Sequence, residues 1–191
     1  IAASAARKGV YMNSCENGYL FKAGEYVSYK KNGICKIADI VTREFVGMDP
    51  KPYYEMEVVF DNHTVLYVPV GSPAEQSMRR VLTAEEVHAV ILESEQYQDP
   101  WIEDGKARAA QFEAMLEEGT RSRILWIMKM LTFHRVQAER ENKKVYAADV
   151  RILETAEKII TEEFSFALKI EKEQVVPYII DHLQSIKQAA G

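Results

Sequence analysis

From Glu25 to Ile40 the chain reads EYVSYKKNGICKIADI. Polar and apolar residues alternate in both halves of this segment, which is the pattern of a strand with one buried face. Between the halves, Asn32 and Gly33 tolerate the positive φ angles of a tight turn. The segment therefore predicts two antiparallel strands joined by a turn.

Two more strands are expected further along the chain. Residues 53–60 and 64–70 are rich in β-branched and aromatic residues, and Asp61-Asn62-His63 joins them as a tight hairpin. Residues 47–52, with a glycine and two prolines, form a loop before this hairpin. Several short strands separated by turns predict a small SH3- or Tudor-like antiparallel β-barrel over residues 21–72.

The spacing of apolar residues changes to three and four after Leu82, which indicates helices. Thr83 and Glu86 have the spacing of a capping box, in which each side chain accepts a hydrogen bond from an unpaired backbone N–H. A first helix is therefore predicted from this point to about Glu93.

Asp99 and Pro100 predict the start of a second helix, because Asp is a favoured N-cap and Pro fits the first helical position. Trp101 would then lie on the first turn of this helix, among polar neighbours. Gly119 predicts its end.

The remaining helices are predicted over residues 121–141, 147–168 and 173–186. Pro177 lies in the last one and removes a hydrogen bond, so that helix is expected either to be kinked or to start later. The fold class is thus α+β, with an all-helical domain of about five helices over residues 78–188. Its core is expected to include Ile124, Leu125, Trp126, Met128, Leu131, Phe133, Ile152, Leu153, Ala156, Ile159, Ile160, Phe164 and Leu168.

Composition sets the class of protein. The chain has 191 residues, of which 47% are hydrophobic and 28% charged, as in ordinary globular proteins. No segment approaches the roughly 20 apolar residues of a membrane span, and the first ten residues lack the apolar region of a signal peptide. We expect a cytoplasmic protein without a membrane partner, and an N-terminal extension in residues 1–20, partly appended to the natural chain.

Cys15 and Cys35 are the two cysteines. We expect two free thiols in a reducing cytoplasm, and a structural disulfide between them is the alternative.

The sequence does not predict an enzyme. The four histidines lie in four different predicted elements without metal-ligand spacing, and neither a nucleophile elbow nor a glycine-rich phosphate loop is present. The adjacent pairs Glu117-Glu118 and Glu162-Glu163 point about 100° apart on a helix and are expected on solvated faces. No catalytic residue, metal, cofactor or small-molecule substrate is therefore predicted.

The charge distribution leaves room for nucleic acid. The net charge of −5 argues against a protein that coats DNA by charge alone. From Lys106 to Lys144, however, nine basic residues stand against five acidic ones. An exposed Trp101 beside this basic segment would make a nucleic-acid edge. The alternative is that Trp101 packs between the barrel and the helices.

Several of these segments together resemble one family. The segments FKAGEYVSY (residues 21–29), NGICKI (residues 32–37) and YVPV (residues 67–70), with Tyr53-Tyr54 between them, are similar to the CarD/CdnL family of bacterial transcription regulators. The helical half adds Met78-Arg79, Val81-Leu82, Trp101 followed by Lys106, and residues 156–164. The resemblance extends over about residues 21–183.

The resemblance implies a function for each half. It implies that the Tudor-like barrel binds the β subunit of RNA polymerase through a strand edge, with Arg43, Leu66 and Tyr67 at contact positions. Several relatives carry a basic residue where this chain has Tyr67.

It also implies that the helical domain contacts promoter DNA at the upstream edge of the transcription bubble. There Trp101 would be a minor-groove wedge, Lys106 would reach phosphate and Arg108 would be a weaker contact. Glu103 and Asp104 stand where some relatives are basic, so weak DNA binding with little sequence specificity is expected. The implied outcome is a stabilised open promoter complex.

Two other functions remain open from the sequence. One is a protein–protein interaction module without a DNA role. The other is a relative of the polymerase-binding module of repair-coupling factors, although those proteins add a helicase motor and this chain lacks a nucleotide-binding loop.

Overall fold

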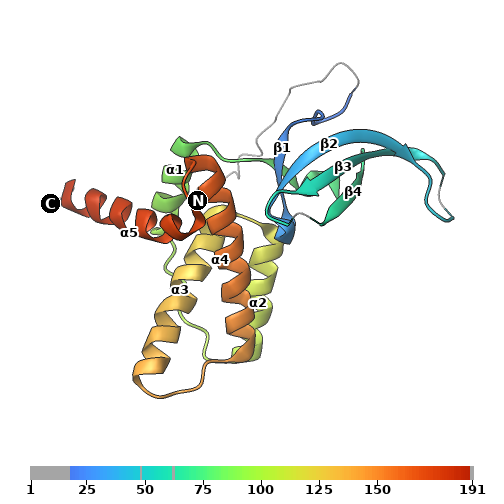
Figure 1. Ribbon diagram of the computed structural model, residues 1–191. Helices are drawn as coiled ribbons and strands as arrows, with labels where there is room; N and C mark the ends of the chain where they lie inside the picture. The colour runs from blue at the N-terminus through green and yellow to red at the C-terminus, as the bar shows by residue number, and fades with distance from the viewer. Residues whose placement is uncertain (1–17, 48, 62, 190–191) are drawn as a thin grey trace, which may run out of the picture.

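The computed structural model describes residues 18–189 except residues 48 and 62. A bent antiparallel sheet lies on one side of the molecule and five helices lie on the other (Figure 1). The predicted α+β class, with the barrel before the helices, is confirmed.

The sheet contains β1 (Tyr26–Tyr29), β2 (Ile34–Arg43), β3 (Lys51–Val58), β4 (Val65–Pro69) and β5 (Met78–Arg80). Their order across the sheet is β4-β3-β2-β1-β5, and every neighbouring pair is antiparallel. The predicted turn between β1 and β2 contains a short 3-10 helix and ends at Gly33, whose φ of 73° favours glycine.

Strand β5 was not expected from the sequence. It pairs with β1, with Val27 opposite Arg80, so the sheet continues eight residues beyond the boundary that we predicted at residue 72. Its three residues are too few to show an alternating pattern, and only the pairing with β1 identifies them as a strand.

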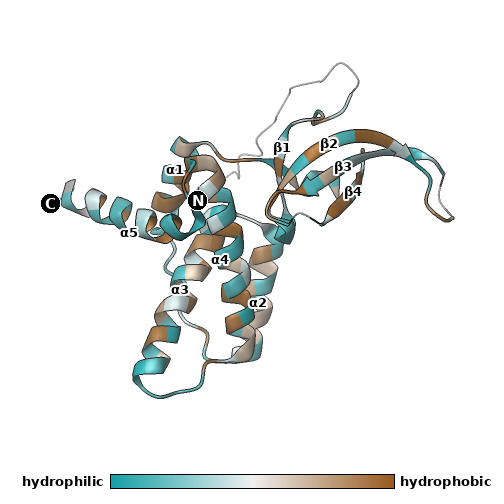
Figure 2. Cartoon of the chain, in the orientation of Figure 1, coloured by the Kyte–Doolittle hydropathy of each residue, from teal (hydrophilic) through white to brown (hydrophobic). Residues whose placement is uncertain are grey.

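A separate hydrophobic core fills the barrel. Apolar and polar residues alternate along its strands, as the colours along β2 and β3 in Figure 2 show. Cys35 is a buried free thiol in this core, and Cys15 lies outside the described residues. The buried core residues are Val27, Cys35, Ile37, Tyr54, Met56, Val58, Val68 and Met78.

The helices are α1 (Ala84–Ser94), α2 (Gly105–Glu118), α3 (Arg121–Arg140), α4 (Ala147–Leu168) and α5 (Lys172–Ala189). The Thr83–Glu86 capping box is present at the start of α1. Gly119 ends α2 in the left-handed conformation, with a φ of 75°.

The predicted start of α2 is wrong. Asp104 is the N-cap, because its carboxylate accepts a hydrogen bond from the Ala107 N–H at 2.7 Å. Asp99 instead forms an ion pair with Arg123 of α3. Trp101 therefore lies in the connection between α1 and α2 and not on a helical turn.

Most predicted core residues of the helical half are buried, Trp126 among them at 4% exposure. Leu168 is only partly buried, and Phe133 was predicted wrongly, because 64% of its surface is exposed. Helix α5 starts one residue before the predicted range and continues through Pro177, so the later start is wrong. Among the described residues, no helix is long and apolar enough to cross a membrane.

Polar contacts join the barrel to the helices. Arg121 of α3 forms an ion pair with Glu163 of α4 and donates a hydrogen bond to Ser28 of β1. Glu162 and Glu163 are 3% and 2% exposed, so our expectation of a solvated face for this pair is wrong. The side of α4 that carries them packs against the barrel, which the sequence of the helix alone does not reveal.

Candidate functional site

Two separate surfaces hold the residues singled out from the sequence. The first lies on the outer side of the barrel, at the edge formed by β4. Arg43 Nη2 donates to the Tyr67 hydroxyl at 3.3 Å, and its guanidinium carbon lies 5.3 Å from the centre of the Tyr67 ring. Glu55, opposite Tyr67 in the sheet, pairs with Arg43 at 3.7 Å. The structure therefore brings two of the three predicted barrel residues together.

Aromatic residues support this first surface. Phe45 contacts the rings of Tyr53 and Tyr67 edge-on, with ring centres 5.1 and 6.1 Å apart. Phe45 itself is 40% exposed, and its neighbour Val46 is fully exposed. The sequence analysis missed Phe45, although an aromatic residue followed by valine just beyond a strand was a visible signal.

Leu66 faces the other way. It lies opposite Met56 in the sheet and packs against the barrel core, so its side chain is on the inner side of β4. Any contact that it makes with a partner at this edge would use its backbone, as in the addition of a strand to a sheet.

The order of the strands separates the two ends of the sheet. Strand β4 is one edge, and in the described part of the chain it pairs with β3 alone. Strand β5 is the opposite edge, and β1 and β5 contact the helices through Ser28 and Arg79. The β3–β4 connection also meets the helices, because Lys172 of α5 lies over the Phe60 ring. The open edge is thus opposite the β5 edge in the order of the sheet.

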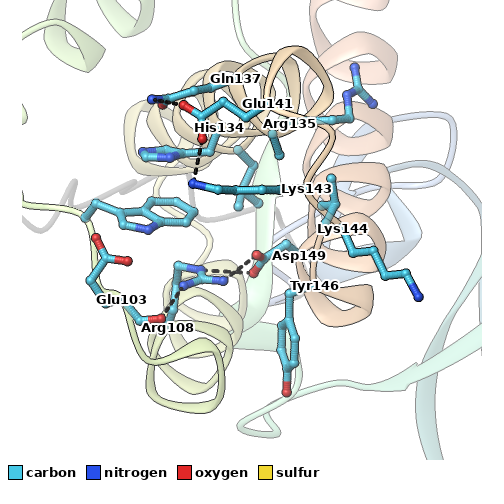
Figure 3. A pocket seen from close by; sticks show the side chains of 14 residues that line it. Glu103, Arg108, His134, Arg135, Gln137, Glu141, Lys143, Lys144, Tyr146 and Asp149 are labelled. Carbon is cyan, nitrogen blue, oxygen red and sulfur yellow. Dashed lines mark hydrogen bonds and ion pairs between the residues drawn. The ribbon is translucent and has the colours of Figure 1, made fainter.

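The second surface is a pocket of about 370 Å³ around Trp101. The ring of His134 stacks on Trp101 with ring centres 3.4 Å apart and planes at 17°. The guanidinium carbon of Arg108 lies 4.2 Å from the centre of the Trp101 ring. Figure 3 shows His134 and Arg108 well separated, with an aromatic ring system between them. Trp101 is therefore held in place by two cationic or titratable side chains.

Arg108 is the buried centre of this pocket. It is 5% exposed and forms a two-pronged ion pair with Asp149 of α4, at 3.1 and 2.5 Å. Its remaining nitrogen donates to the carbonyl oxygens of Ile102 and Glu103 at 2.5 and 3.3 Å. With its donors occupied in this way, Arg108 is placed to hold Trp101 and its loop. This geometry does not favour the DNA contact that the resemblance implied.

Lys106 is exposed in the first turn of α2. A cation at a helix N-terminus opposes the helix dipole, so Lys106 does not stabilise α2 from this position. Its charge is free to meet an anion from solution.

Further cations line the pocket. Arg135 and Lys144 form no ion pair within the described residues, whereas Lys143 pairs with Glu141 at 2.6 Å. Figure 3 shows Lys144 extending away from the pocket and Lys143 reaching across it. The rim therefore offers two uncompensated cations to an anionic partner.

His134 carries little positive charge at neutral pH. Burial, and then the nearby Arg108 guanidinium, lower the pKa of His134 below its ordinary value of 6.5. A neutral imidazole suits its position on an indole ring that also contacts a guanidinium. No sequence pattern indicated this stack, because Trp101 is 33 residues away in the chain.

A second histidine cluster joins α1 to α5. His88 and His182 stack with ring centres 4.5 Å apart, and His88 Nε2 lies 2.5 Å from the Tyr178 hydroxyl. Over the described residues, no group of three or more His, Cys, Asp or Glu residues is arranged to hold a metal ion.

A comparison with protein families bears on the barrel. Residues 21–82 match the CarD-like/TRCF RID domain. The match covers all five strands and ends where the first helix is about to begin. A comparison with curated proteins gave no match.

The match to the CarD-like/TRCF RID domain confirms the resemblance over these residues and is consistent with a CarD-like protein. This domain is an RNA polymerase-interacting domain, which suggests polymerase binding and a role connected with transcription. Its matched residues include Arg43, Leu66 and Tyr67. Trp101, Lys106 and Arg108 lie outside it.

Proposed function

We propose that this chain is a CarD-like transcription regulator of the bacterial cytoplasm that stabilises the open promoter complex. Its barrel binds the β subunit of RNA polymerase, and its helical domain brings Trp101 to the upstream edge of the transcription bubble. The observation that carries the proposal is the match of the barrel to a polymerase-interacting domain, combined with an open sheet edge at β4.

The edge of β4 suits a strand of a partner protein. An unpaired strand edge supplies a row of backbone donors and acceptors, and neighbouring side chains fix the register. Arg43 and Tyr67 stand beside this edge and hold each other through a hydrogen bond. Tyr67 thereby contributes to the contact by orienting Arg43, in place of the basic residue of some relatives.

The surroundings of Trp101 suit a side chain that inserts into DNA as a wedge. Because His134 and Arg108 cover its ring, the indole is rigid and offers an edge more than a free face. A rigid aromatic inserted where base pairing ends hinders the strands from closing again. A contact worth about 1.4 kcal/mol would change an opening equilibrium about tenfold.

DNA binding by the helical domain alone should be weak. Glu103 and Asp104 stand beside Trp101, and among the described residues Lys106, Arg135 and Lys144 have no ion-pair partner. Binding to the polymerase raises the local concentration of the wedge at the promoter, so a weak contact suffices. Few base contacts also mean little sequence specificity.

The test is the half-life of the open complex with matched polymerase on one promoter. Trp101→Ala should remove the lengthening of the half-life and leave polymerase binding intact. Arg43→Glu should weaken recovery of polymerase in a pull-down, and Lys22→Glu, at an exposed position before β1, is the matched control. An unchanged half-life with Trp101→Ala would remove the wedge from the proposal.

A second function has one observation in its favour. Trp101 packs against the core of the helical domain and stacks on His134, as a purely structural tryptophan would. In that case the chain is an interaction module without a DNA role. Acrylamide quenching of Trp101 fluorescence, with and without promoter DNA in the polymerase complex, separates the two, because only a DNA contact makes quenching depend on DNA.

A further inference from the structure

We infer that α2 is a rigid spacer that sets the position of Trp101 relative to the barrel, and that Arg79, Arg121 and Glu163 are the positioning residues that hold it. The inference rests on the proposed function, since it concerns how the wedge is aimed when the barrel is bound. It assigns these residues no contact with DNA or polymerase.

The C-terminal end of α2 is held by the barrel. Arg79 of β5 donates to the carbonyl oxygens of Glu118 and Gly119, both at 2.7 Å. These carbonyls belong to the last turn, which carries the negative end of the helix dipole and has no partners within the helix. Beside them, Lys31 of the β1–β2 turn pairs with Glu117 at 2.7 Å.

A buried network fixes the same end to the rest of the bundle. Arg121 donates to the Gly119 carbonyl oxygen at 2.5 Å and forms its ion pair with Glu163, and the two side chains are 10% and 2% exposed. Ser28 of the barrel bonds to both of them. One set of contacts thus ties β1, α3 and α4 to the end of α2.

The other end of α2 carries the wedge. Trp101 lies three residues before the N-cap, Asp104, and Arg108 in the second turn of α2 holds its ring. Figure 1 shows this end of α2 far from the sheet, with the α1–α2 connection running alongside α3 to reach it. At 1.5 Å per residue, the 14 residues of α2 separate the two ends by about 20 Å.

Packing keeps α2 from sliding. Ala109, Phe112 and Leu116 are buried along one side of the helix in the core of the helical domain. A displacement of the clamped end is therefore passed to Trp101 as a rigid movement. A tether raises local concentration usefully only when its geometry matches the site. Loss of the clamp, meaning the contacts of Arg79, Arg121 and Glu163 at this end of α2, should therefore weaken the contact of Trp101 with DNA although Trp101 itself is unchanged.

The test begins with Arg79→Ala, an exposed residue whose loss leaves both cores intact. Polymerase affinity should stay unchanged, and the Trp101-dependent lengthening of the open-complex half-life should be largely lost. Arg79→Lys, which can donate to the same carbonyls, should restore part of it. Lys22→Ala removes one cation from the barrel outside the clamp and should behave as wild type.

A charge exchange at the neighbouring pair gives an independent test. Lys31→Glu and Glu117→Lys, each alone, place like charges together and should shorten the half-life. The two substitutions combined recreate an ion pair and should restore it. Restoration by the combined variant is not expected of residues that act through separate contacts.

Distances between spin labels read the clamp directly. Labels at Lys36→Cys in β2 and Arg151→Cys in α4, both exposed, should give a narrow distance distribution that broadens with Arg79→Ala. An unchanged distribution and an unchanged half-life in Arg79→Ala would overturn the inference. If Trp101→Ala also has no effect on the half-life, the proposed function fails, and the distance distribution still decides the role of the clamp.

Discussion

Arg108 offers a sharp test, because sequence resemblance and structure assign it different roles. As a DNA contact, Arg108 could be replaced by alanine with little change in stability. As the partner of Asp149 under Trp101, it could not. We therefore consider Arg108→Ala, Asp149→Ala and the combination of both.

The magnitude follows from burial. Arg108 and Asp149 side chains are 6% and 7% exposed, and two hydrogen bonds of 3.1 and 2.5 Å join them. Removing one partner of such a pair leaves a buried charge and costs about 3–5 kcal/mol of unfolding free energy. For a chain of this length that lowers the melting temperature by roughly 6–20 °C.

The assay is urea and thermal unfolding followed by circular dichroism. Each single variant should lose several kcal/mol, and the double variant should lose less than their sum by about 0.5–3 kcal/mol. Arg108→Met with Asp149→Leu should recover most of the stability, because apolar side chains of similar size often replace a buried ion pair without loss. If each single variant costs less than about 1 kcal/mol of unfolding free energy, the structural role of the Arg108–Asp149 pair is refuted and Arg108 is again a candidate DNA contact.

Three further predictions concern the interface, the thiol and the stack. Gly33→Ala should lower the unfolding free energy by more than Gly47→Ala. Both glycines have a positive φ, where strain costs about 1–3 kcal/mol, but only at Gly33 would a Cβ lie 2.4 Å from a Glu162 carboxylate oxygen. Equal urea midpoints of the two variants would argue against this contact. Burial raises the pKa of Cys35 to about 11, so peptide mapping after iodoacetamide should find it unmodified until the protein is unfolded, and rapid alkylation of the native protein would contradict its burial. Because the pKa of His134 is lowered in the folded protein, its contribution to stability is complete above pH 6.5 and is lost as the pH falls through the pKa of the folded state. His134→Phe should therefore make the unfolding free energy less dependent on pH below 6.5. An unchanged pH profile in this variant would exclude His134 as a source of the dependence.

Local signals in the sequence predicted the elements well. The capping box at Thr83 and the glycine at position 119 act through bonds to their immediate neighbours, and both mark helix ends in the structure. The alternation along β2 and β3 likewise predicted the barrel, because it reports which side of each strand is buried.

The predictions from sequence are wrong where a residue far away in the chain determines the contact or the burial. Asp99 has the right neighbour for an N-cap, but its carboxylate pairs with Arg123, and Asp104 takes the cap. Phe133 has the spacing of a core residue, yet 64% of its surface is exposed and its ring contacts the ring of the adjacent His134 edge-on. Glu162 is charged and nevertheless buried, because the barrel covers it.

The candidate sites divide in the same way. The sequence and its resemblance singled out Arg43, Tyr67 and Trp101, and the structure brings the first two into contact. His134, which supports Trp101, had no signal of its own, since support depends on which residues the fold brings together. Phe45 did have a visible signal, but its contact with Tyr67 appears in the fold alone.

The placement of β4 and β5 at opposite edges of the sheet bears on the order in which partners can bind. A partner strand on β4 would displace no described strand, because β4 pairs with β3 on its other side. Under the proposed function, the chain could therefore join the polymerase before promoter DNA arrives, remain there while the bubble opens, and stay bound after the DNA has moved on. Binding at the β4 edge would set no order for DNA contacts at the Trp101 end of the helical domain.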